Sequence, residues 1–226
     1  MTLKERIQKW YKREREKLST MKTGEKISYF FTYYKGWLIG FLLLCMLVGY
    51  VADAVVQSGK EIVLQGFFTN DEYDLFPAEA LQKEIGDLIG LQKGQRVVFD
   101  DDLYVDLDGQ AREYSAASNG KIIAYMAVGE LDFVVTSKSV FEHYAGDVPL
   151  KDIGALLPEG LKQKLSPWLM EGQDGDGKAG YVAIDMAESR YLRDSELVGE
   201  GEYFLFVPYS APHGEAIAQF IAYCFE

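Results

Sequence analysis

The longest uninterrupted apolar stretch of the chain covers residues 36–52, GWLIGFLLLCMLVGYVA, and it contains no charged residue. Extending the stretch to Val56 adds a single charge, Asp53. A helix of about 20 residues crosses a hydrocarbon core of roughly 30 Å. A single segment can cross only as a helix, because lipid offers the backbone no hydrogen-bond partners. The pattern therefore predicts one N-terminal transmembrane helix.

Aromatic residues crowd the N-terminal side of this stretch, as is typical of a membrane–water interface. They are Tyr29, Phe30, Phe31, Tyr33, Tyr34 and Trp37. We therefore predict a transmembrane helix with an aromatic flank over residues 27–56, which contacts the lipid bilayer through residues 29–56. A basic cytoplasmic segment, residues 1–26, precedes it, and an extracytoplasmic domain, residues 57–226, follows it.

Charge is divided unevenly about the apolar stretch. Residues 1–35 hold ten basic and four acidic residues, a net charge of +6, whereas the remainder holds 13 basic and 31 acidic residues, a net charge of −18. Basic residues near the end of a membrane span mark its cytoplasmic side. We therefore predict a single-pass protein of the plasma membrane with a cytoplasmic N-terminus and an extracellular C-terminal domain.

The basic segment itself predicts a helix over residues 3–18. Ile7, Trp10, Tyr11 and Leu18 form a thin apolar stripe at helical spacing. One interpretation is a basic helix that lies on anionic lipid. The other is a tail that only sets the topology.

Two other fates of the apolar stretch compete with a retained anchor. Ala52-Asp53-Ala54 resembles a signal-peptide cleavage site, but the preceding charged region and the apolar run are both longer than in a signal peptide. Cys45 could mark a lipoprotein, but Leu44 stands where a small residue is needed and the apolar run continues beyond it. Length therefore favours the anchor.

Beyond residue 60, short apolar runs alternate with helical patterns. The predicted strands are residues 61–69, 96–110, 131–137, 179–186 and 202–210, and the predicted helices are residues 76–90, 119–130, 139–146 and 213–226. Residues 150–165 predict turns and helix, and residues 171–180 a loop rich in Gly and Asp. Strands that alternate with helices predict an α/β domain with a largely parallel or mixed sheet.

Composition narrows the chemistry. The chain has 226 residues, a net charge of −12, two Cys and two His. A net acidic charge disfavours nucleic acid as a partner. Two widely spaced Cys predict no disulfide framework, and two distant His predict no zinc site. No nucleophile elbow, metalloprotease motif or phosphate-binding loop occurs. We therefore predict no catalytic residue, no metal and no cofactor.

Two Asp-x-Asp-Gly segments, residues 106–109 and 174–177, invite comparison with calcium loops. If their Gly is taken as the sixth loop position, the first position is Tyr104 or Gly172. The twelfth position is Ser115 or Ala183. None of these supplies a carboxylate, so both segments predict solvated turns.

Several segments resemble type 2 periplasmic solute-binding proteins. In residues 118–135 a helical pattern ends in a Gly-Glu-x-Asp turn and feeds a strand, and residues 140–146, 150–153 and 216–225 are similar to later parts of those proteins. The chain also resembles small single-span membrane proteins of Gram-positive bacteria. The resemblance implies a single lobe with a mixed sheet flanked by helices. Residues 60–226 are too short for the two lobes that clamp a ligand in those proteins.

Ligands of open α/β sheets bind beyond the carboxyl ends of the strands. At those ends stand Thr69, Asn70, Thr136, Ser137, Tyr209 and Ser210. Their hydroxyl, amide and phenol groups suit a neutral polar ligand. The leading interpretation is a non-enzymatic interaction or sensing module whose partner is a membrane-protein complex. The alternatives are a binding protein for a small polar ligand (sugar, peptide or amino acid) and a cleft hydrolase.

Overall fold

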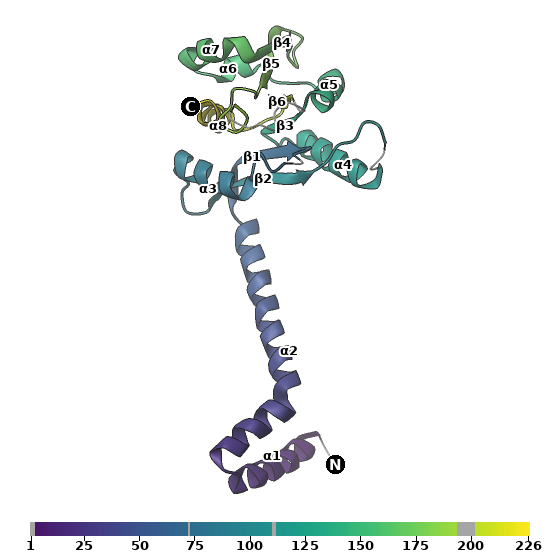
Figure 1. Cartoon of the computed structure of the whole chain (residues 1–226), viewed down its shortest axis with the longest axis vertical. Coiled ribbons are helices and arrows are strands. Elements are labelled where there is room, and N and C mark those ends of the chain that lie inside the picture. Colours follow the sequence, from purple (N-terminus) through teal and green to yellow (C-terminus); the bar gives the residue numbers. More distant parts are fainter. Residues whose placement is uncertain (1–2, 72, 110–111, 194–201) are drawn as a thin grey trace. The chain divides into compact units, whose positions relative to one another are not determined.

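A computed structural model of the chain describes residues 3–71, 73–109, 112–193 and 202–226. The chain divides into two compact units, Met1–Gly59 and Lys60–Glu226. The first unit holds two helices, and the second is an α/β domain built on a mixed six-stranded sheet (Figure 1).

The first unit contains α1 (Leu3–Thr20) and α2 (Thr23–Ser58). Within α2, the stretch Tyr34–Ser58 contains an 18-residue window with a mean hydropathy of 2.3, and no residue of that window is buried. By length and composition α2 is therefore able to span a membrane. The hydroxyl of Tyr29 donates to the carboxylate of Glu14 over 3.0 Å and joins the two helices.

The sheet of the second unit has the order β2-β1-β3-β6-β5-β4. Its strands are β1 (Glu61–Thr69), β2 (Gln95–Leu103), β3 (Phe133–Ser137), β4 (Leu169–Gln173), β5 (Ala179–Asp185) and β6 (Tyr203–Phe206). β1 pairs in parallel with β2 and β3, whereas β6 is antiparallel to β3 and to β5, and β5 is antiparallel to β4. The predicted α/β class with a mixed sheet is confirmed.

Helices cover both faces of the sheet (Figure 1). One layer comprises α3 (Ala78–Ile89), α6 (Ile153–Leu156), α7 (Glu159–Leu165), the short 3₁₀ helix η1 (Ser166–Trp168) and α8 (Gly214–Cys224). The other comprises α4 (Arg112–Val128) and α5 (Lys138–Asp147). The first layer covers a larger apolar cluster, in which Phe133 stacks on Phe220 with ring centroids 4.3 Å apart. Cys224 is fully buried there, and burial raises the pKa of its thiol.

The predicted strand 96–110 is shorter in the structure, because β2 ends at Leu103. Side chains, rather than a neighbouring strand, accept hydrogen bonds from the next three backbone amides. The amide of Tyr104 donates to Ser118, that of Val105 donates to Asn70, and that of Asp106 donates to Ser115. The predicted helix 119–130 begins earlier in the structure, at Arg112. Its additional first turns carry Ser115 and Ser118, which are buried against the chain after β2 that they hold.

The predicted loop 171–180 is largely a β-hairpin. Its strands β4 and β5 pair from Leu169↔Ile184 to Gln173↔Ala179, and the Asp174 carboxylate closes the turn by accepting from the amides of Asp176 and Lys178. The predicted strand 202–210 shrinks to β6, because the chain meets Pro208 soon after it.

Candidate functional site

Thr69 ends β1, and Thr136, the last residue but one of β3, lies next to it, as parallel pairing allows. Both side chains are fully buried, and their hydroxyl oxygens are 2.5 Å apart in a hydrogen bond. One hydroxyl donates to the other inside the sheet. The two threonines therefore stabilise the pairing of β1 with β3 and present no hydroxyl to solvent.

Asn70 follows β1 in the left-handed region, with φ of 60°. Its side-chain amide donates to the carbonyl of Val105 over 2.8 Å and accepts from the amide of Val105 over 2.9 Å. Its own carbonyl accepts from the Tyr203 hydroxyl over 2.8 Å. Asn70 thus fixes the chain after β2. Ser137, at the end of β3, lies at the same edge, with its hydroxyl 3.4 Å from that of Ser139.

Tyr209 and Ser210 lie elsewhere. β6 runs antiparallel to β3, so the chain that leaves β6 emerges at the edge where β3 begins. Ser210 donates there to the carbonyl of Met126 near the end of α4 over 2.7 Å. The structure therefore brings Thr69, Asn70, Thr136 and Ser137 together and separates Tyr209 and Ser210 from them.

Tyr209 fastens the β4–β5 hairpin to the chain after β6. Its hydroxyl donates to the carboxylate of Asp176 over 2.8 Å. That hydrogen bond, with further help from Lys178, lowers the pKa of Asp176. The same bond raises the pKa of Tyr209. Both groups are exposed, so the contact orders the hairpin turn without burying a charge.

Two adjoining hollows open on the face of the sheet that α4 and α5 cover. The larger, of about 620 Å³, lies between α5 and the β4–β5 hairpin, with Phe141 and Val182 as apolar walls and Asp147, Glu171 and Asp174 as acidic ones. The smaller, of about 240 Å³, is almost wholly apolar, and Tyr209 and Ser210 line it together with Ile123 and Met126. Val148 and Pro149 border both. The larger hollow has the size and mixed lining of a small-molecule site.

A carboxylate–imidazole pair, of which the carboxylate is buried and the imidazole partly exposed, lies at the edge where β3 begins. Asp132 is fully buried, and its carboxylate accepts from the amide of Gln65 over 2.7 Å and from the amide of His213 over 3.0 Å. The Nδ1 of His213 lies 3.0 Å from the same carboxylate. His213 immediately precedes α8, so Asp132 ties the start of that helix to β1 and β3.

The sequence alone does not reveal this pair as a unit. Its pattern places Asp132 only in a turn and His213 only near a helix start, because 81 positions separate them. His213 borders a surface hollow of about 380 Å³ together with Glu215 and Gln219. Among the described residues, no hydroxyl or thiol is hydrogen-bonded to the imidazole. The same residues contain no group of three His, Cys, Asp or Glu placed to hold a metal ion.

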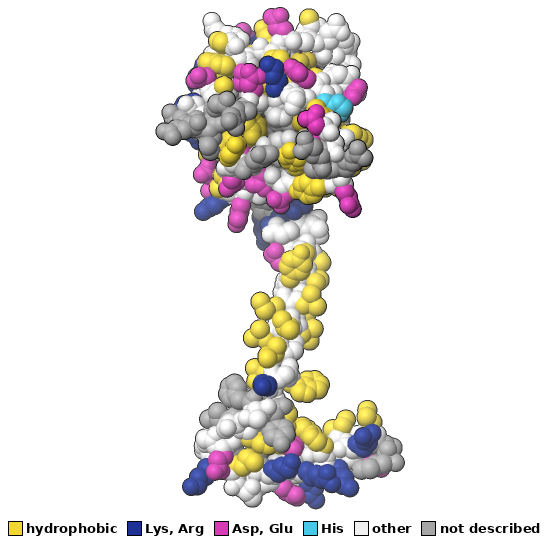
Figure 2. All heavy atoms as spheres, turned by 45° about the vertical axis from the view of Figure 1, so that its right-hand side comes forward, with side chains coloured by type: hydrophobic (Ala, Val, Ile, Leu, Met, Phe, Trp, Pro, Cys, Tyr) yellow, Lys and Arg dark blue, Asp and Glu magenta, His cyan; other side chains and the backbone are white. Residues whose placement is uncertain are grey.

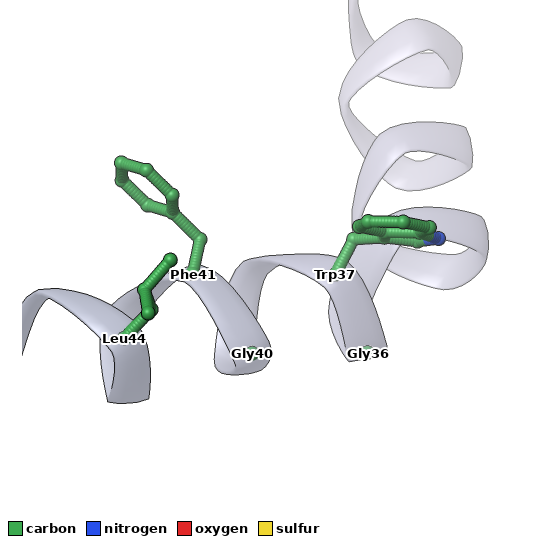
Figure 3. Close-up of a pocket in the computed structure, with 5 residues that line it drawn as sticks. All are labelled: Gly36, Trp37, Gly40, Phe41 and Leu44. Carbon is green, nitrogen blue, oxygen red and sulfur yellow. The ribbon is translucent and has the colours of Figure 1, made fainter. Parts of the chain in front are cut away.

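A further hollow, of about 510 Å³, lies on the surface of α2. Figure 3 shows Trp37, Phe41 and Leu44 along one part of this helix, with Gly36 and Gly40 beside them. A side-chain carbon added at either glycine would have no atom within 4 Å, so the helix backbone is open on that side. This groove belongs to the apolar part of α2, where lipid or another helix is the natural neighbour.

Comparison with known proteins adds no assignment. No protein-family model, curated protein or solved structure matches the chain.

Proposed function

We propose that the chain is a single-pass membrane protein whose α/β domain lies outside the cytoplasm and acts as a tethered, non-enzymatic interaction or sensing module. The observation that carries this proposal is the apolar length of α2, which the described residues leave unburied. Such a surface is stable in lipid and unfavourable in water. The ten basic residues among residues 1–35 place the N-terminus in the cytoplasm by the positive-inside rule.

The tether is short. α2 ends at Ser58 and β1 begins at Glu61, so only Gly59 and Lys60 join them. A domain held this closely to the membrane has a high effective concentration toward a membrane-protein partner. In the described part of the domain, all six strands belong to one sheet, as in a single lobe of a solute-binding protein. A single lobe lacks the second wall of a clamshell, which favours interaction over ligand capture.

Impermeant maleimide labelling of intact cells tests the anchor and its orientation. Lys93→Cys, at an exposed turn of the domain, is expected to label without permeabilisation, and Thr23→Cys, at the start of α2, only after it. Cys224 is buried and gives little background, and Cys45 is changed to Ala in both variants. The reverse labelling pattern would refute the orientation. A soluble mature chain beginning near Ala54 would refute the anchor.

The larger hollow favours a second candidate, a binding site for a small polar ligand. Its acidic walls, Asp147, Glu171 and Asp174, suit the amino group of an amino acid or short peptide. A ligand at about 100 times its dissociation constant stabilises a protein by about 2.7 kcal/mol, which is roughly 5–10 °C in melting temperature for a domain of this size. Thermal-shift measurements on the full chain with amino acids, peptides and sugars test this candidate.

Two tryptophan variants of α5 distinguish the hollow from other surfaces. Ala145→Trp fills it and is expected to abolish any ligand-dependent shift. Ser139→Trp lies on the same helix but does not line the hollow, so it is expected to keep the shift. Equal loss in both variants, or no shift with any compound, would eliminate the ligand-binding candidate and leave the interaction module.

A further inference from the structure

The helix that precedes the span, α1, carries an apolar stripe that the chain leaves exposed. Leu3, Ile7, Trp10 and Tyr11 are between 53% and 74% exposed. At about 100° per residue, these four side chains fall within about 50° of a common direction on the helix. The large exposed apolar residues of α1 therefore form one face.

Charged residues are ordered around this face. At about 100° per residue, basic residues border it at roughly 70–110° from its centre on both sides, and Glu5, Glu16, Lys9 and Lys12 fall on the far side. The bordering residues are Lys4 and Arg15 on one side and Arg6, Arg13 and Lys17 on the other. Figure 2 shows the same separation, with hydrophobic side chains of α1 on the side toward the apolar length of α2 and most Lys and Arg side chains on the other.

One acidic residue, Glu14, falls within the apolar face, and the structure accounts for its charge. Its carboxylate accepts from the hydroxyl of Tyr29 over 3.0 Å and lies 3.5 Å from the ammonium group of Lys17. Glu14 thus links α1 to the first turns of α2. An isolated carboxylate would oppose docking on lipid, but this carboxylate is paired with Lys17 of α1 and hydrogen-bonded to Tyr29 of α2.

The N-terminal turns of α2 set the level of α1. A bilayer with its headgroups is roughly 40–45 Å thick, so its headgroups end about 20–22 Å from its centre. When residues 36–52 are centred in the bilayer, Thr32 and Lys35 fall at about the level of the inner headgroups. The earlier turns of α2 lie beyond them, on the cytoplasmic side, and Figure 1 shows these turns bent away from the direction of the apolar part. α1 ends at Thr20, only two residues before α2 begins.

From this arrangement we propose that α1 is a second membrane contact, which lies along the cytoplasmic surface of the bilayer and binds anionic phospholipid headgroups. The apolar face enters the boundary between headgroups and acyl chains, where Trp and Tyr are favoured. The bordering Lys and Arg side chains extend from there to the phosphates. This contact rests on the proposed function only in that α2 must span the membrane.

Trp10 provides a direct probe of this contact. We would use the full chain with Trp37→Phe and Trp168→Phe, so that Trp10 is the sole tryptophan, in nanodiscs of phosphatidylcholine with or without phosphatidylglycerol. Brominated phospholipid is expected to quench Trp10 with phosphatidylglycerol present and much less without it. Retention of α2 is measured separately, by co-elution of the protein with lipid, so failure of the span and failure of docking are distinguishable.

Two charge variants test the geometry. Each basic residue near an anionic surface contributes about a factor of five, so Arg6→Gln with Arg15→Gln should lower the ratio of docked to undocked α1 about thirtyfold. Lys9→Gln with Lys12→Gln removes the same charge from the far side, where screening weakens the attraction, and should lower the ratio only about fivefold.

Three results would overturn the proposal. The first is no quenching in either lipid, and the second is equal quenching in both lipids that neither pair of substitutions changes. The third is a Trp10 that is shielded from aqueous acrylamide but not quenched by brominated lipid, which would assign the apolar face to a protein partner instead.

Discussion

Asp132→Asn is expected to destabilise the α/β domain by about 2–4 kcal/mol. The carboxylate is fully buried and accepts from two backbone amides, those of Gln65 and His213, and contacts the His213 imidazole as well. An asparagine has one acceptor oxygen and directs an NH₂ group at one of these donors. Each buried donor left without a partner costs about 1–3 kcal/mol. Denaturant unfolding of the purified chain would measure the loss.

Asp176→Asn is the matched control. Asp176 also accepts a hydrogen bond, from Tyr209, and contacts Lys178, but it is exposed. Exposed charge pairs contribute little, so this substitution should cost less than about 1 kcal/mol. A double variant of Asp132→Asn with His213→Ala should cost less than the sum of the single changes, because the two residues share one interaction. Unfolding free energies of Asp132→Asn and wild type that agree within about 0.5 kcal/mol would refute the role assigned to Asp132.

Distance along the chain decides what the sequence can reveal about this site. Local periodicity predicts β1 to its first and last residue and places α3, α5 and α8 within two residues of their ends. The partners of Asp132, by contrast, are 67 and 81 positions away. No local pattern encodes which backbone amides a buried carboxylate will meet after folding.

The candidate ligand residues show a second limit of sequence analysis, which concerns the direction of the strands. Grouping Tyr209 and Ser210 with Thr69 and Thr136 requires β6 to run parallel to β1 and β3, and the structure pairs β6 antiparallel. Strand direction depends on pairing across the sheet, which alternating hydrophobicity does not report. The sequence pattern does not predict β4 for another reason: it is an edge strand, and only Leu169 of its five residues, Leu-Met-Glu-Gly-Gln, is buried, so it has no alternation of apolar and polar positions.

Gly66→Ala is expected to destabilise the domain by about 3 kcal/mol, because the centre of the sheet has no room for one more carbon. Gly66 lies in β1, which is paired on both sides, by β2 and β3. An added side-chain carbon would lie 2.1–2.6 Å from three ring atoms of Phe133. That ring cannot withdraw easily, since it is fully buried and stacked on Phe220. Forcing extra volume into a packed core costs typically about 1–3 kcal/mol and occasionally more.

Two further variants show whether the contact with Phe133 is the cause. Gly120→Ala, inside α4 where nothing lies within 4 Å of the added carbon, should instead stabilise the domain by about 0.5–1 kcal/mol, because alanine favours a helix. Phe133→Leu shortens the opposing side chain, so adding it to Gly66→Ala should recover at least about 1 kcal/mol relative to the sum of the two single costs. Strictly additive costs in this cycle would show that the alanine acts elsewhere, through the backbone of β1, and that the aromatic packing around Phe133 tolerates the extra carbon.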